Sequence, residues 1–250
     1  LDDLVFAHGQ DALSVQIWDL SSDQSIYQFH PDRVQTLAST QKLITAALAW
    51  QTLGPLDSFH TRLVAEGVRK KETWLGSLTL ELSGDPTLST HDLESFIQTL
   101  KQKNIKTIAG PFMIAIGIEP MPGLGPGWMW DERKDCYAAP YSPATLDHNC
   151  FEVTLTGHGV GQPPTMKVHA SEQASAVRHS VVVVDDPSPS CDLKVVPSDD
   201  GIYPLQGCVA PGQQKTIQLA VQDPVERLKE KLTRLLQAEG ITVTQGVRVH

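Results

Sequence analysis

The sequence predicts a mixed α/β (α+β) fold, on the strength of three observations. Short runs of alternating apolar and polar residues, typical of half-buried strands, recur along the 250-residue chain. Longer runs carry apolar residues at helical spacing and follow capping residues. The region Phe151–Val221 breaks into short strand-like pieces separated by glycine, proline, serine and aspartate, which indicates a small β-rich module.

The first predicted elements are two strands and a helix. Leu13, Val15 and Ile17 alternate with polar neighbours, which predicts a strand. A return strand is predicted at Ser25–Phe29, after a polar turn. The Ala/Leu-rich segment Leu37–Leu53 predicts a long helix that ends at a Gly-Pro pair.

Two further strands and a capped helix are predicted next. The strands are Thr61–Val64 and Leu75–Leu82, the second with clean alternation. Ser89 and Asp92 form a capping pair before a helix whose apolar residues recur every three or four positions up to Leu100.

The remaining elements outside the β-rich module are a buried strand, a loop, a helix and a last strand. Phe112–Ile118 predicts the buried strand, and Glu119–Trp130 is rich in glycine and proline. Asp223 is a good N-cap for a helix over Val225–Glu239. Ile241–Val249 alternates again and predicts one strand.

Composition and charge exclude several classes of protein. Hydrophobic residues make up 40% and charged residues 20% of the chain, which is ordinary globular usage and excludes disorder and collagen-like repeats. A net charge of −9 gives no electrostatic reason to bind nucleic acid or an anionic membrane. No apolar run approaches the length of about 18–20 residues that spans a bilayer, so an integral membrane protein is not expected.

The four cysteines predict disulfides rather than a metal site. They form no CxxC and have no histidine cluster at zinc-ligand spacing, so neither a metal nor a cofactor is predicted. Pairing of sequence neighbours is the economical arrangement, although three connectivities exist and four buried free thiols are the alternative. Bridged cysteines would place the protein in an oxidising compartment, periplasmic or extracellular. The cysteines are Cys136, Cys150, Cys191 and Cys208.

A serine and a lysine three residues apart are the candidate catalytic pair. Ser39 and Lys42 would share one helix face. A serine hydroxyl needs a base to take its proton, and a lysine in apolar surroundings can be that base. Leu37, Leu43 and Ile44 are expected to supply those surroundings. About one such spacing is expected by chance in a chain of this length, and a solvated lysine on a helix turn is the alternative.

Several motifs together resemble the class C penicillin-binding proteins, the serine D-alanyl-D-alanine carboxypeptidases and endopeptidases of the bacterial cell wall. The two cysteine pairs also fall at the spacing of that family, and the resemblance covers nearly the whole chain. The motifs are LASTQK (Leu37–Lys42), SGDPTL (Ser83–Leu88), PGWMW (Pro126–Trp130) and AVQDP (Ala220–Pro224).

The resemblance implies a split, serine-transpeptidase-like (β-lactamase-like) domain with two nested insertions. Residues 1–56 would be the first segment of this nucleophile domain. An inserted α/β domain would comprise residues 57–144 and 217–250. A β-rich domain, residues 145–216, would be nested within the inserted one.

The resemblance also implies site residues and partners. Ser39 would be the nucleophile, Lys42 its general base, and the Ser39 N–H half of the oxyanion hole. The substrate would be a peptidoglycan stem peptide, cleaved through an acyl-serine, and β-lactams would acylate the same serine. Glu132 and Tyr137 fall where family members recognise a stem-peptide side chain. The family residue is an aspartate, so neighbouring Asp131 is a substitute for Glu132.

Two family motifs are absent from these 250 residues, a Ser-x-Asn and a Lys-Thr-Gly. In the family they help to shuttle the proton and bind the substrate carboxylate. We therefore expect an N-terminal portion that is inactive alone and is completed by a missing C-terminal portion or a companion chain. The alternative is a non-catalytic module that binds or scaffolds cell wall. A serine β-lactamase is a weaker third hypothesis, because it would lack the nested insertion.

Overall fold

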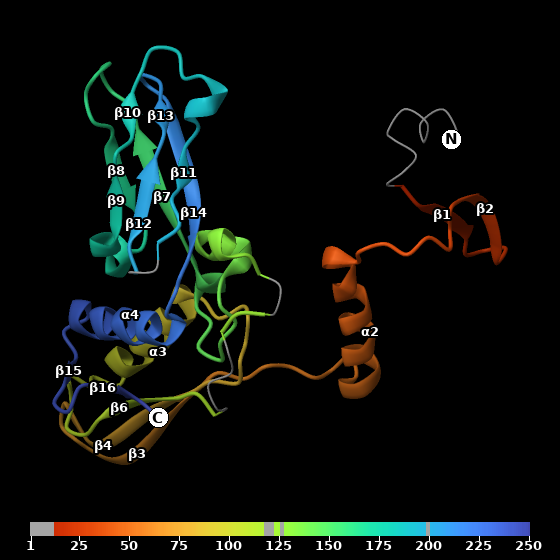
Figure 1. The fold of residues 1–250 in the computed structure, drawn as a ribbon. Coiled ribbons are helices and arrows are strands. Elements are labelled where there is room, and N and C mark those ends of the chain that lie inside the picture. Colours follow the sequence, from red (N-terminus) through yellow and green to blue (C-terminus); the bar gives the residue numbers. More distant parts are fainter. Residues whose placement is uncertain (1–12, 118–122, 126–127, 199–200) are drawn as a thin grey trace. The chain divides into compact units, whose positions relative to one another are not determined.

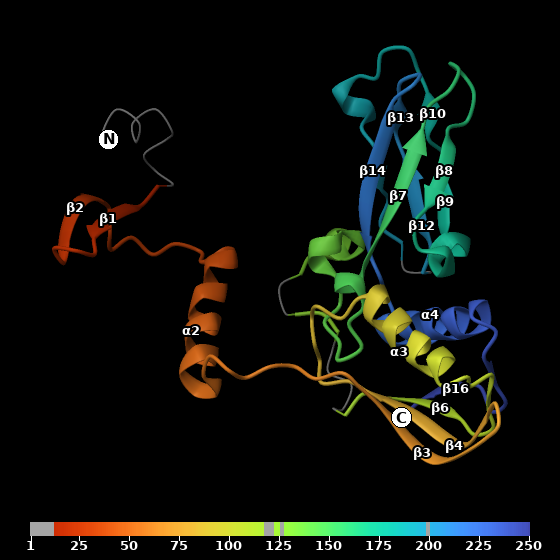
Figure 2. The same cartoon turned by 180° about the vertical axis from the view of Figure 1, so that it is seen from behind.

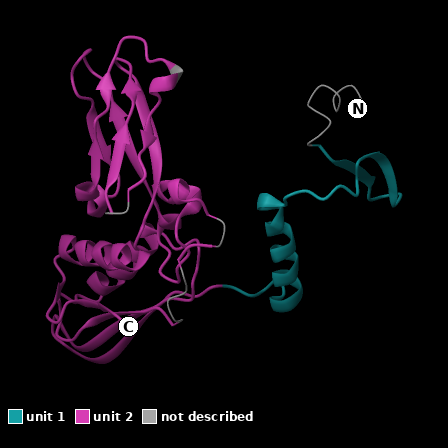
Figure 3. Ribbon diagram, viewed as in Figure 1, with its two compact units in different colours: residues 1–58 teal, residues 59–250 magenta. Residues whose placement is uncertain are grey.

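The computed structural model of the chain describes residues 13–117, 123–125, 128–198 and 201–250. It divides into two compact units, Leu1–Ser58 and Phe59–His250 (Figure 3). Both units contain helices and strands, so the expected mixed α/β class is confirmed. Within the described ranges, no helix is both long and apolar enough to cross a membrane.

Unit 1 contains a hairpin and a helix. The predicted strands are β1 (Val15–Asp19) and β2 (Gln24–Phe29), which pair antiparallel (Figure 1). The predicted long helix begins as a 3-10 turn, η2 (Ala38–Thr40), and continues as α2 (Gln41–Leu53). Gly54 ends α2 at a φ of 83°, a backbone conformation that glycine adopts without strain.

A six-stranded sheet forms the base of unit 2. Its central strand β4 pairs antiparallel with β3 on one edge, and parallel with β5 and β6 on the other. Strands β15 and β16 lie beyond β5 and β6, again parallel. The strands are β3 (Arg62–Lys70), β4 (Thr73–Glu81), β5 (Thr107–Ile108), β6 (Phe112–Ala115), β15 (Thr242–Val243) and β16 (Val247–Val249).

Two helices, α3 (Thr90–Gln102) and α4 (Pro224–Ala238), cover one face of this sheet (Figures 1 and 2). Ser89 caps α3 through a capping box with Asp92, and the Asp223 side chain caps α4, as predicted. The helices bury their apolar faces against the sheet. The core between them includes Leu78, Leu80, Leu93, Ile97, Ile108, Phe112, Ile114, Leu228, Leu232 and Leu236.

The prediction of one continuous strand over Ile241–Val249 is wrong, because a turn closed by a hydrogen bond from the Gly246 N–H to the Val243 oxygen separates β15 from β16. Residues 109–111 likewise separate β5 from β6, while β3 and β4 are continuous beside them. Gly67 pairs with Gly76, and a Cβ on Gly110 would lie 2.3 Å from the Gly76 oxygen. Only glycine permits this close approach of the backbones.

The predicted Phe112–Ile118 strand is shorter than expected, ending at Ala115, while Ile118 lies outside the described residues. The Glu119–Trp130 loop also falls partly outside them, and Trp130 already begins η3 (Trp130–Lys134). The next 3-10 turns are η4 (Cys136–Ala138) and η5 (Asp147–Asn149).

The β-rich module rises from this layer as short strands around a second hydrophobic core. One sheet has the order β14-β7-β8, another β11-β12-β9, and β10 pairs with β13. Its buried residues include Phe151, Val153, Leu155, Tyr203, Leu205 and Leu219. The elements are β7 (Cys150–Thr156), β8 (Thr165–Val168), η6 (Ser171–Ala176), β9 (Val177–His179), β10 (Val182–Val183), η7 (Pro189–Cys191), β11 (Lys194–Val195), β12 (Tyr203–Gln206), β13 (Cys208–Val209) and β14 (Gln214–Ala220).

Candidate active site

The candidate nucleophile and base are in direct contact. The Lys42 Nζ donates a hydrogen bond of 2.9 Å to the Ser39 Oγ. Ser39 lies in the 3-10 turn η2 and Lys42 in the first turn of α2, which brings the two side chains to one side of the helix start. The turn is closed by a hydrogen bond from the Thr40 N–H to the Leu37 oxygen at 3.0 Å.

The backbone just before the candidate nucleophile is strained. Ala38 has a φ of 46°, in the left-handed region that residues with a Cβ adopt at a cost of about 1–2 kcal/mol. Such conformations persist only where the surrounding structure enforces them, and they concentrate at functional sites. The strain therefore adds a second, independent reason to regard Ser39 as part of a site.

The apolar surroundings expected for Lys42 are not supplied by its own helix. Leu43 is 73% exposed, and Leu37 and Ile44 are about half exposed. No residue of α2 is buried. The shielding of Lys42 by these three side chains therefore stays a prediction.

A second group of polar side chains surrounds η3 and η4 in unit 2. Desolvation, a hydrogen bond to Glu132 and the nearby carboxylates raise the pKa of Tyr137 to about 12. The Trp128 ring lies 5.7 Å from the Tyr137 ring, centroid to centroid. The structure thus brings Glu132 and Tyr137 together, with exposed Asp131 beside Glu132 on η3.

Sequence reasoning missed a third carboxylate in this group. Asp135 lies between η3 and η4, and desolvation raises its pKa, assisted by the charges of Glu132 and Asp131 and opposed by a hydrogen bond with Tyr137. Asp135 could have been found from its position two residues before Tyr137, because a carboxylate so close in sequence can lie beside the phenol and affect its pKa.

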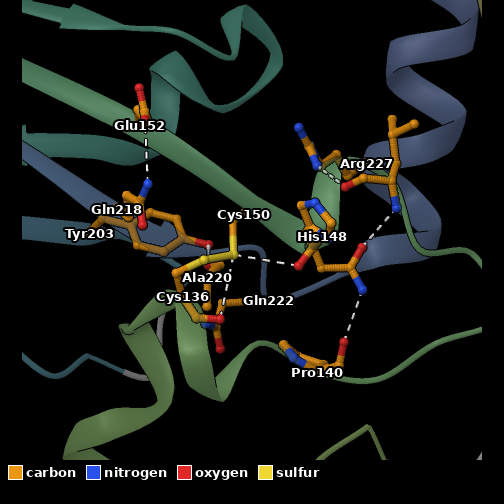
Figure 4. The surroundings of a disulfide bond; sticks show 12 residues. Cys136, Pro140, His148, Cys150, Glu152, Tyr203, Gln218, Ala220, Gln222 and Arg227 are labelled. Atoms are coloured by element: carbon orange, nitrogen blue, oxygen red, sulfur yellow. Dashed lines mark hydrogen bonds between the residues drawn. A yellow bond between two sulfur atoms is a disulfide. The ribbon is translucent and has the colours of Figure 1, made fainter. Parts of the chain in front are cut away.

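Two disulfides join the cysteines that are neighbours in sequence, Cys136–Cys150 and Cys191–Cys208, which confirms the economical pairing. Figure 4 shows the first one linking η4 to the start of β7, between Tyr203 and His148. This bond anchors the turn that carries Tyr137 to the β-rich module.

The turn before Cys150 holds three consecutive residues in the left-handed region. Asp147, His148 and Asn149 have φ values of 48°, 58° and 55°. Asn149 Nδ2 donates to the Pro140 oxygen at 2.9 Å, and its Oδ1 accepts from the Leu146 N–H at 3.1 Å. These bonds fix the disulfide against the segment that follows η4 (Figure 4).

The described part of the chain shows no group of three or more histidine, cysteine, aspartate or glutamate side chains placed to hold a metal ion. Ser39 and Lys42 belong to unit 1, whereas the carboxylates around Tyr137 belong to unit 2. The chemistry that the described residues offer is thus that of a serine nucleophile with an amine partner, and of a carboxylate-rich surface for a cation.

Comparison with known proteins identifies the family. The model of the D-Ala-D-Ala carboxypeptidase 3 (S13) family matches residues 5–250. D-alanyl-D-alanine carboxypeptidase DacB of Haemophilus influenzae is 29% identical over 226 residues, covering 89% of this chain and 47% of the relative. The D-alanyl-D-alanine carboxypeptidase of Actinomadura sp. (strain R39) is 24% identical, covering 93% of this chain and 45% of the relative.

Solved structures agree with this result. The crystal structure of penicillin binding protein 4 (dacB) from Haemophilus influenzae matches with a TM-score of 0.80 and 27% identity, covering 99% of this chain and 55% of that one. The same protein in complex with a β-lactam matches with a TM-score of 0.72 and 25% identity, covering 100% and 54%. This chain therefore spans about half the length of the relatives it matches, and it belongs to the D-Ala-D-Ala carboxypeptidase 3 (S13) family.

Proposed function

We propose that this chain carries the nucleophile and general base of a serine D-Ala-D-Ala carboxypeptidase/endopeptidase that acts on peptidoglycan stem peptides. The observation that carries the proposal is the 2.9 Å contact between the Lys42 Nζ and the Ser39 Oγ. Family membership supports it, and so does the crystal structure of the Haemophilus influenzae relative in complex with a β-lactam.

In this proposal Lys42 takes the proton of Ser39 as the Oγ attacks the carbonyl carbon of the penultimate D-alanine. The peptide C–N bond breaks, the leaving D-alanine nitrogen gains a proton, and an acyl-serine remains. Water then cleaves the ester and restores the Ser39 hydroxyl. A β-lactam would acylate the same oxygen by opening its ring. The Ser39 N–H, at the positive end of α2, would stabilise the developing oxyanion.

The described residues supply only part of such a site. The Ser-x-Asn and Lys-Thr-Gly motifs are absent from the sequence, and the relatives are about twice as long. We propose that a missing C-terminal portion or a companion chain brings the carboxylate anchor, the second oxyanion donor and the apolar cover that α2 lacks. Residues 1–250 alone would then be inactive.

The carboxylates around Tyr137 form the proposed subsite for the stem-peptide side chain. Asp131, Glu132 and Asp135 would attract a cationic group, and the Trp128 and Tyr137 rings would pack against its aliphatic part. The acidic character at the Glu132 position is thus kept, although the residue is not the aspartate of the family pattern.

The domain division and location are part of the same proposal. Residues 1–56 would belong to the nucleophile domain, residues 57–144 and 217–250 to the inserted α/β domain, and residues 145–216 to the nested β-rich domain. The unit boundary at Ser58 and the two separate cores of unit 2 support three parts, but β14 (Gln214–Ala220) packs Leu219 into the core of the β-rich module, which moves the end of the nested domain from residue 216 to the end of β14. Two disulfides support a periplasmic or extracellular location.

The deciding experiment is covalent labelling by a fluorescent penicillin. A polypeptide that joins residues 1–250 to the completing segment should be labelled, and Ser39→Ala should abolish labelling. Ser95→Ala, at an exposed position on α3, is the matched control and should label normally. A completed, folded protein that takes up no label would overturn the proposal.

A non-catalytic cell-wall-binding module is the second candidate, because the Trp128 and Trp130 side chains are 42% and 48% exposed and sugar rings stack on such surfaces. It predicts that the unlabelled protein sediments with isolated cell wall, and that Trp128→Ala releases it.

A further inference from the structure

Basic side chains gather at one end of the six-stranded sheet. The end of β3 carries Arg69 and Lys70, the turn that follows carries Lys71, and all three are exposed. The link between α3 and β5 lies directly beside this turn, because the Lys106 N–H donates to the Glu72 oxygen at 2.8 Å.

That link adds two more exposed cations, Lys103 and Lys106. Lys106 Nζ pairs with Glu72 Oε1 at 2.8 Å, and the pKa of Glu72 is lowered chiefly by its hydrogen bond with Lys106. Five cations and one carboxylate give this sheet end a net charge of +4, whereas the whole chain carries −9.

The sign of the local charge decides what can approach this surface. Exposed charges more than about 8 Å apart are largely screened at physiological ionic strength. The acidic residues elsewhere in the chain therefore do not cancel the charge of the sheet end. The net charge of the whole chain disfavours an anionic partner, but this region carries the opposite sign and attracts one.

Two exposed apolar side chains accompany the cations. Val68 and Leu75 are paired across β3 and β4, and they are 65% and 42% exposed. Leu78 and Leu80 of β4 point into the core beneath the helices. By strand alternation, Leu75 and its partner Val68 face the opposite side of the sheet, which α3 and α4 leave uncovered (Figure 2).

We propose that this hairpin end binds the headgroup region of an anionic phospholipid bilayer. The surface consists of residues 68 to 75 together with Lys103 and Lys106. Basic side chains are attracted to anionic lipids, and apolar side chains beside them gain from entering the interface. The Val68–Leu75 pair selects a bilayer over a soluble polyanion, because a polyanion offers no apolar layer to receive it.

The test is co-sedimentation of the chain with vesicles of phosphatidylcholine alone or mixed with phosphatidylglycerol. Binding should require phosphatidylglycerol and weaken as salt is raised. Lys70→Gln with Lys103→Gln should lower the affinity about 25-fold, at about five-fold for each charge removed. Lys167→Gln with Lys194→Gln, which changes net charge equally on the β-rich module, should have little effect.

The apolar pair is tested in the same assay. Val68→Thr with Leu75→Thr should weaken binding to mixed vesicles several-fold, and Val182→Thr, at a 49% exposed strand position, is the control. Circular dichroism confirms that each variant is folded. The proposal is overturned by no binding to mixed vesicles, or by equal losses in the control variants. It is also overturned if the chain binds soluble polyphosphate but not vesicles.

Discussion

Arg227 Nε lies 3.3 Å from Glu172 Oε1, and both side chains are almost completely buried. The pair joins α4, above the six-stranded sheet, to η6 of the β-rich module. Arg227 also donates to the Leu146 oxygen at 2.6 Å and to Asp147 Oδ2 at 3.2 Å. One guanidinium thus connects α4 with η6 and with the turn before Cys150, and Lys231 of the same helix lies 3.6 Å from the other Glu172 oxygen.

Removing the cation from this pair is expected to be costly. Arg227→Met keeps much of the aliphatic volume but leaves the Glu172 carboxylate buried without its main partner, which should lower the free energy of unfolding by about 3–5 kcal/mol. Lys229→Met breaks an exposed pair with Glu226 on the same helix and should cost less than about 1 kcal/mol. Urea denaturation measures both, and equal losses would contradict the assigned role.

Lys42→Arg tests the proposed proton transfer. A guanidinium stays protonated at physiological pH and so cannot accept the Ser39 proton. In the completed protein the rate of acylation by a fluorescent penicillin should fall by about 10²–10⁴-fold, the usual contribution of a general base. Lys167→Arg on the β-rich module is the matched control. Acylation at the native rate in Lys42→Arg would show that this amine is not the base.

Tyr203 should make stability depend on alkaline pH. Burial raises its pKa to about 12, and its hydroxyl donates to the Ala220 oxygen at 2.8 Å. In the unfolded chain it ionises near pH 10. The stability from its neutral form is therefore complete below about pH 10 and is lost as pH rises towards about 12.

The measurement compares the wild type with Tyr203→Phe, which has no group to ionise. Relative to Tyr203→Phe, the wild type should lose on the order of 2 kcal/mol of unfolding free energy over this interval. A constant difference would mean that Tyr203 ionises as readily in the fold as in the unfolded chain.

Gly76→Ala tests the close approach of β3 and β4. A Cβ there would lie 1.9 Å from the Glu66 oxygen, at a φ of 151°. We expect a loss of about 3 kcal/mol or more, since backbone must move. Gly212→Ala, at a φ of 74° with nothing within 4 Å, isolates the conformational cost and should lose about 1 kcal/mol. Thermal unfolding separates the two, and similar losses would contradict a steric role.

Local patterns predicted what depends on local chemistry. Ser89 and Asp223 marked the starts of α3 and α4, because a capping side chain bonds to the helix that immediately follows it. Spacing likewise placed Ser39 beside Lys42, since three residues make nearly one helical turn.

Features that depend on neighbouring strands or distant residues escaped prediction. The turn between β15 and β16 separates two strands that pair with different partners, β5 and β6, which alternation within Ile241–Val249 cannot reveal. The Arg227–Glu172 pair joins residues 55 positions apart, and both look like ordinary surface charges in the sequence. The exposure of Leu43 also could not be foreseen. An apolar residue in the sequence indicates that its side chain can be buried, but not whether another part of the structure packs against it.

Cys150, the first residue of β7, and Ala220, the last residue of β14, pair with each other at one end of the β7–β14 ladder. The chain thus leaves and re-enters the helix-covered layer at adjacent points. An insertion whose two connection points lie side by side can be added or removed without moving those points apart. A short linker could therefore bridge the two points, but removing the module would also take away Glu172 and leave the buried Arg227 guanidinium without that partner.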